Sequence, residues 1–100
     1  MIVEWTLPAL DDLMELRDYI AQDSAVTAQR FIGCFFEAAE RLTEQPKMGR
    51  RVPEAERDDV RELMVEKYRL IYLLETDKVS VLTVIRGSRD LAGMSVKPWE

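Results

Sequence analysis

The sequence has 100 residues, no histidine and a single cysteine, Cys34. A structural zinc site takes four cysteine or histidine ligands, so this chain lacks the residues for one, and we expect no metal. No serine or cysteine has a histidine to activate it as a nucleophile, and Gly87 alone does not make a glycine-rich phosphate loop. We therefore expect no cofactor. Cys34 lies in an apolar helical pattern, which indicates a buried free thiol in a reducing cytoplasm.

Glycine and proline are also scarce, with four residues each, and no repeat or low-complexity segment interrupts the chain. The composition, 47% apolar and 33% charged, is that of a globular protein, and the length predicts one domain over residues 1–100. No apolar run is long enough to cross a bilayer, and no charged-then-apolar signal segment stands at the start. We expect a cytoplasmic protein without a membrane partner.

Positive charge is in deficit, since the net charge is −5. Residues 1–44 carry nine acidic and three basic side chains, a net of −6, and residues 45–100 carry ten acidic and eleven basic ones. A protein that binds nucleic acid through its overall charge is basic, so we expect no direct sequence-specific nucleic-acid binding. Local arginines could still contact a phosphate or an acidic partner.

Apolar periodicity predicts the secondary structure. Residues 2–7 alternate as in a strand, and helical spacing predicts a helix from Pro8 to about Gln22 and a second over residues 25–44, with Thr6 and Ser24 as N-caps. Three further strands follow, at 60–66, 68–75 and 78–86. The order β-α-α-β-β-β predicts an α+β fold, in which two N-terminal helices pack on one face of a four-stranded, mainly antiparallel sheet.

The loop Pro46–Asp59 mixes arginines with acidic residues. Such mixed runs are usually solvated surface, so we expect no chemistry in this loop. Arg69 interrupts the strand 68–75, and a buried arginine on a strand usually pairs with a carboxylate, here that of Glu62 or Asp90.

Tyr68–Leu91, YRLIYLLETDKVSVLTVIRGSRDL, carries a resemblance. It is similar to the ParE/RelE superfamily of bacterial type II toxins, and closest to the ParE branch, whose sheet usually ends in a similar Gly-x-Arg-Asp-like segment. The resemblance implies a toxin that inhibits DNA gyrase and blocks replication by binding, not as an enzyme. The candidates for its target-binding surface are Arg69, Arg86, Arg89, Asp90 and Trp99. A tryptophan this close to the terminus could instead anchor the tail to the body.

The resemblance also implies a cognate antitoxin, ParD-like with a disordered C-terminal tail, and a toxin–antitoxin hetero-oligomer. The apolar stripes of the two helices exceed what their shared seam needs. We expect an amphipathic partner segment there, locally basic because residues 1–44 are acidic. Its candidate contacts are Leu13, Leu16, Arg17, Phe31 and Phe35. For Arg17, the alternative is a stem that lies along the edge of the core with its head in water.

Two other functions stay open. The RelE-like branch of the superfamily consists of ribosome-dependent mRNA endonucleases, and Arg69 and Arg89 match its phosphate-binding arginines. Cleavage also needs a base and an acid, and this sequence has no histidine, no tyrosine after Tyr72, and Glu62 and Glu66 where those nucleases have paired lysines. The third possibility is an inactive relative that only binds its antitoxin and represses transcription with it.

Overall fold

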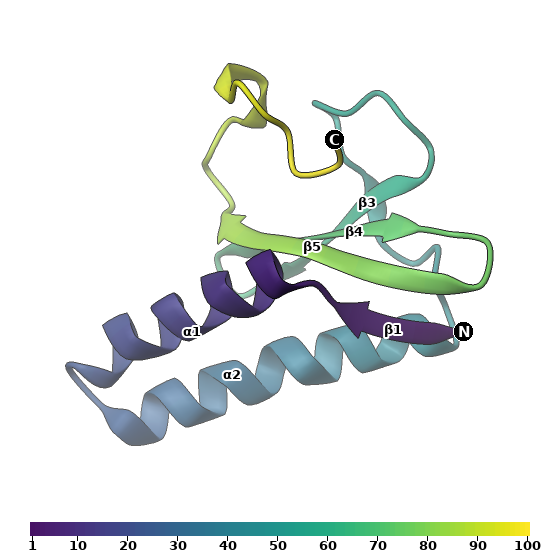
Figure 1. Ribbon diagram of the computed structural model, residues 1–100. Coiled ribbons are helices and arrows are strands. Elements are labelled where there is room, and N and C mark those ends of the chain that lie inside the picture. Colours follow the sequence, from purple (N-terminus) through teal and green to yellow (C-terminus); the bar gives the residue numbers. More distant parts are fainter.

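The computed structural model describes residues 1–100 (Figure 1). A side-chain cap begins each of its two α-helices. The Thr6 hydroxyl accepts a hydrogen bond from the Ala9 N–H at 3.3 Å and begins α1 (Leu7–Ala21). The Ser24 hydroxyl accepts from the Thr27 N–H at 3.1 Å and begins α2 (Ala25–Glu40). Both caps are as predicted. The regular part of α2 ends before the predicted residue 44, because the chain tightens into the 3-10 helix η1 (Arg41–Thr43).

The sheet has five strands, where the sequence predicted four. They are β1 (Ile2–Trp5), β2 (Arg50–Arg51), β3 (Val60–Val65), β4 (Tyr68–Leu74) and β5 (Lys78–Arg86), in the spatial order β1-β5-β4-β3-β2. β3, β4 and β5 form the predicted antiparallel meander, and β1 pairs with β5 in parallel. The additional strand, β2, has only two residues, which is too short for an alternating pattern to be visible in the sequence.

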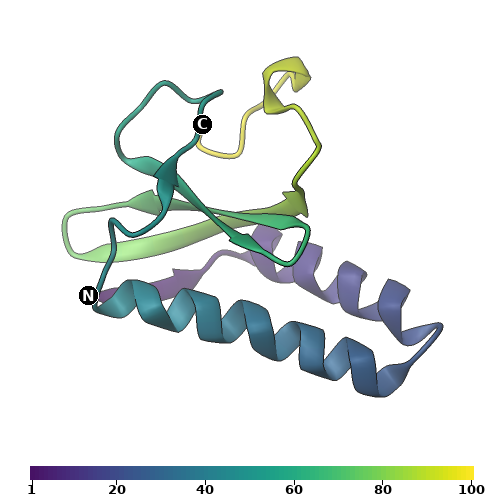
Figure 2. The same cartoon turned by 180° about the vertical axis from the view of Figure 1, so that it is seen from behind.

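The sheet has a hydrophobic core on each face. Figure 1 and Figure 2 show the two helices on one side of the sheet and the C-terminal tail on the other. The two helices cover one face, where Leu13 and Phe35 pack with strand residues such as Leu70. The loop after β2 and the C-terminal tail cover the other face with a smaller core that contains Val52, Val60, Ile71 and Leu91, and Trp99 packs against it. The tail is therefore anchored to the body. None of the helices has the length and apolar character that crossing a membrane requires.

An irregularity in β5 fixes the position of α1. The register pairs Ile71 with Thr83 and Tyr72 with Val81, so that Leu82 is skipped. Beside this bulge, Asp12 of α1 accepts hydrogen bonds from the Thr83 hydroxyl and from the Val84 N–H. These contacts tie α1 to the second half of β5, close to the end of the strand where the predicted arginines lie.

Candidate functional site

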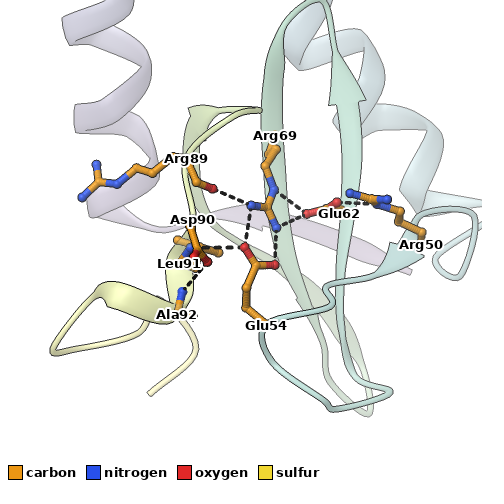
Figure 3. Close-up of polar contacts among 8 residues, drawn as sticks. All are labelled: Arg50, Glu54, Glu62, Arg69, Arg89, Asp90, Leu91 and Ala92. Carbon is orange, nitrogen blue, oxygen red and sulfur yellow. Dashed lines mark hydrogen bonds and ion pairs between the residues drawn. The ribbon is translucent and has the colours of Figure 1, made fainter.

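Arg69 of β4 is the centre of a buried ion-pair cluster (Figure 3). Its Nε donates to Glu62 Oε1 at 2.7 Å, and its Nη1 and Nη2 donate to the two oxygens of Glu54, each at 2.9 Å. The side chain of Arg69 is 4% exposed, that of Glu62 is fully buried and that of Glu54 is 15% exposed. Arg50 also donates to Glu62. Two arginines and two carboxylates thus compensate each other's charge.

The strand register brings three members of this cluster together. Arg50 on β2 is paired with Glu62 on β3, and Arg69 on β4 is paired with Met64, one pleat further along β3. Glu62 therefore lies between the two arginines on the face opposite the helices. The predicted pairing of Arg69 with Glu62 is confirmed, while its alternative partner Asp90 accepts a hydrogen bond from the Ala92 N–H.

Glu54 comes from the loop between β2 and β3, which we predicted to be solvated surface, and that prediction is wrong for this residue, because its side chain is 15% exposed and pairs with Arg69. The hydrogen bonds from Arg69 lower the pKa of Glu54 to about 2, and the Leu91 N–H contributes to the shift. The pKa of Arg69 is in turn raised, chiefly by its hydrogen bond to Glu54. Both groups therefore stay charged throughout the physiological pH range.

The cluster also binds the backbone that follows β5. Arg69 Nη1 donates to the carbonyl oxygen of Arg89 at 2.9 Å, and the Leu91 N–H donates to Glu54 Oε2 at 3.1 Å. Asp90 caps the short 3-10 helix η2 (Leu91–Gly93) by accepting from the Ala92 N–H at 2.9 Å. Asp90, a predicted contact residue, thus has a defined role in shaping the segment.

The side chain of Arg89 points away from the cluster (Figure 3). Arg86 and Arg89 are both exposed, and neither guanidinium has a hydrogen bond or ion pair within the chain. They line a groove of about 560 Å³ between α1 and the ends of β4 and β5. The groove is also lined by the apolar side chains of Leu16, Tyr19 and Tyr68, and by Asp12 and Glu15 of α1. It therefore combines apolar side chains with charged groups of both signs.

The structure separates the predicted target-binding residues. Arg86 and Arg89 line the same groove, whereas Arg69 is buried and contacts the exposed segment only by its hydrogen bond to the Arg89 carbonyl oxygen. Trp99 is half-buried against the second core. Sequence reasoning missed Glu54 and Arg50 because an alternating charged loop gives no local sign of which of its residues is buried.

The predicted antitoxin contacts also separate. Leu13 and Phe35 are fully buried in the core between the helices and the sheet, and offer no surface to a partner. Leu16 and Phe31 are half-buried at its edge, where the Phe31 ring lies 5.3 Å from that of Tyr68. Arg17 is exposed and pairs with Asp18 at 3.1 Å. The helices therefore present an apolar rim, with Leu16 lining the same groove as Arg89.

Comparisons with known proteins agree with this architecture. Residues 3–91 match the family described as the ParE toxin of the type II toxin-antitoxin system parDE. Toxin RelE2 of Caulobacter vibrioides is 34% identical over 87 residues, which cover 87% of this chain and 96% of that protein. A solved structure of a chromosomal ParDE TA system from P. aeruginosa has a TM-score of 0.72 and 22% identity, covering 86% of this chain and 95% of the other, and thus has the same fold.

The fold and these matches define a toxin of the ParE/RelE superfamily, as the Tyr68–Leu91 stretch predicted. Within it, the chain belongs to the ParE toxin family of type II toxin–antitoxin systems. Membership in such a system implies an antitoxin as the partner of this chain.

Proposed function

We propose that this toxin blocks replication by inhibiting DNA gyrase, and that it acts by binding, trapping the topoisomerase on cut DNA. The observation that carries this proposal is the match of residues 3–91 to the ParE family, since gyrase is the target that the resemblance to that branch implies. Arg86 and Arg89 are the proposed contact residues, because their guanidinium groups are exposed and have no partner within the chain. A guanidinium can bind a carboxylate or a phosphate through two parallel hydrogen bonds.

The second candidate function is a ribosome-dependent mRNA endonuclease, which the name of the relative Toxin RelE2 favours. Arg69 and Arg89 match the phosphate-binding arginines of those nucleases. The N–H groups of Arg69, however, already donate to Glu54, Glu62 and the Arg89 carbonyl oxygen. A phosphate at Arg69 would have to displace two carboxylates from a nearly closed site. This argument supports binding by Arg89 and weighs against cleavage. The third candidate is a non-toxic relative that binds only its antitoxin.

The antitoxin that we propose is ParD-like, with a C-terminal tail that is disordered when free, and forms a hetero-oligomer with the toxin in the cytoplasm. The apolar rim of the helices, which includes Leu16, lies beside the acidic groups Asp12 and Glu15 of α1. An amphipathic segment with basic residues would match both features. Ordering that segment costs free energy, so a tight complex must bury several large side chains.

Three measurements separate the candidates. Purified gyrase is assayed for supercoiling with and without a stoichiometric excess of the toxin. Arg57→Ala serves as a control variant, because it removes an exposed arginine that lies outside the groove. Inhibition by the wild type and by the control supports the proposal, and unimpaired supercoiling refutes it. Primer extension on translated messages after induction tests for cleavage, and new ends would favour the endonuclease. Normal growth of cells that express the toxin without antitoxin would favour the inactive relative.

A further inference from the structure

The Glu54 side chain, from the loop between β2 and β3, contacts the backbone of the segment that carries Arg89 (Figure 3). Its Oε2 atom accepts hydrogen bonds from Arg69 Nη1 at 2.9 Å and from the Leu91 N–H at 3.1 Å. The same Nη1 donates to the Arg89 carbonyl oxygen at 2.9 Å. Arg89 is therefore fixed at its own carbonyl and at the N–H two residues later, and both contacts depend on the Glu54–Arg69 pair.

Few other contacts set the direction of this segment. The Arg89 N–H donates to the Arg86 carbonyl oxygen at 3.1 Å, and Asp90 caps the turn that follows. The Arg86 carbonyl belongs to the last residue of β5, and the Gly87 N–H donates to the Lys67 carbonyl oxygen at 2.8 Å, so these two contacts fix where the segment leaves the sheet. The Asp90 cap lies within the segment and defines the shape of the turn. Arg89 and Asp90 are exposed, and Leu91 is the first residue after them that is buried. Between the strand end and the buried Leu91, the contacts from Glu54 and Arg69 are the side-chain contacts that hold the backbone at Arg89.

We propose that Glu54 is a positioning residue for toxicity, which directs Arg89 toward the target by holding the Arg89–Leu91 backbone against Arg69. This inference rests on the proposed function, in which the Arg89 guanidinium contacts the target. Glu54 is 15% exposed, and both of its oxygens are engaged by Arg69, so it acts through Arg89 without touching the target. Releasing the segment would leave Arg89 free to occupy many orientations, of which only a fraction is competent for binding.

The size of the effect follows from that fraction. The apparent affinity for a target falls in proportion to the population of the competent conformation, so a competent fraction of a tenth weakens binding about tenfold. The contacts of Arg69 with Glu62 do not involve the segment, so the sheet keeps its buried pair when Glu54 changes.

Two variants test the proposal. Glu54→Asp keeps the negative charge beside Arg69 but is one methylene shorter, so it cannot hold Arg69 and the Leu91 N–H together. Glu54→Gln keeps the length but puts an amide N–H₂ against donors of Arg69 or Leu91. Glu56→Gln is the matched control, since Glu56 is exposed in the same loop and its carboxylate has no partner in the chain. Circular dichroism first establishes which variants are folded.

The readouts are growth inhibition, gyrase inhibition, antitoxin binding and the exchange rate of the Leu91 amide by NMR. For both Glu54 variants we expect faster exchange at Leu91 and a loss of inhibition of about tenfold or more, with antitoxin binding retained. Glu56→Gln should match the wild type in every readout.

A folded Glu54→Asp variant with wild-type inhibition would overturn the proposal. Unchanged exchange at Leu91 would overturn it as well, without reference to any target. If the wild-type toxin does not inhibit gyrase, the proposed function fails, and growth inhibition by the same variants then decides the positioning role. If Glu54→Gln unfolds, Glu54→Asp carries the test, since it preserves the charge that compensates Arg69.

Discussion

Replacing Arg69 with alanine should destabilise the fold far more than replacing an exposed arginine that also binds a carboxylate through two of its nitrogens. The substitution leaves the buried Glu62 with Arg50 as its single charged partner, and leaves Glu54 with the Leu91 N–H. Breaking a buried ion pair from one side typically costs about 3–5 kcal/mol, because the remaining charge is uncompensated. Since Arg50 still contacts Glu62, we expect a loss near the lower end, roughly 3 kcal/mol.

For a domain of this size, each kcal/mol corresponds to roughly 4–8 °C in melting temperature, so Arg69→Ala should melt at least about 12 °C below the wild type. The assay is thermal and urea unfolding followed by circular dichroism. The matched control is Arg57→Ala, because Arg57 contacts both oxygens of Asp59 at 2.9 and 2.7 Å but the two side chains are 45% and 41% exposed. Exposed pairs add little to stability, so the control should melt near the wild type. Equal losses in the two variants would refute the reasoning, since burial would then not determine the cost.

Three further predictions follow from the same contacts. Arg89→Ala should change the free energy of unfolding by less than about half a kcal/mol while abolishing growth inhibition, as judged by melting and plating against Arg57→Ala. The pKa of Glu54 is lowered to about 2 from an ordinary value of 4.5, so its contribution to stability is complete above pH 4.5 and is lost as the pH falls toward 2. When the free energy of unfolding is measured across this pH window, Glu54→Gln should therefore lose less stability than the wild type. Gly49→Ala should destabilise, because its Cβ would lie 2.5 Å from a carbonyl oxygen of β3, whereas Gly33→Ala meets nothing within 4 Å and should raise the melting temperature through helix propensity.

Local signals in the sequence predicted the elements well. Thr6 and Ser24 cap the two helices, and the apolar runs 68–75 and 78–86 form the central strands because each signal acts over a few neighbouring residues. The two-residue strand β2 was missed, since its existence depends on pairing with β3 and not on its own composition.

The candidate site was predicted less completely, because its defining contacts join residues that are distant in the chain. Arg69 was identified as a candidate, but its main partner Glu54 lies in a loop where acidic and basic residues alternate, and only the tertiary fold shows which of them is enclosed. Leu13 and Leu16 belong to one apolar stripe, yet the first is fully buried and the second lines the groove. Periodicity identifies the apolar face of a helix, but it does not show how much of that face is buried against the sheet.

The most direct test of the central claim measures gyrase-mediated DNA cleavage. Purified gyrase, relaxed or supercoiled plasmid and the toxin are incubated, the reaction is stopped with detergent and protease, and linear DNA is quantified for the wild type, Arg89→Ala and Arg57→Ala. If the toxin traps gyrase on cut DNA through Arg89, linear DNA accumulates with the wild type and Arg57→Ala but not with Arg89→Ala. No linear DNA with the wild type, or equal amounts with all three proteins, would contradict the account.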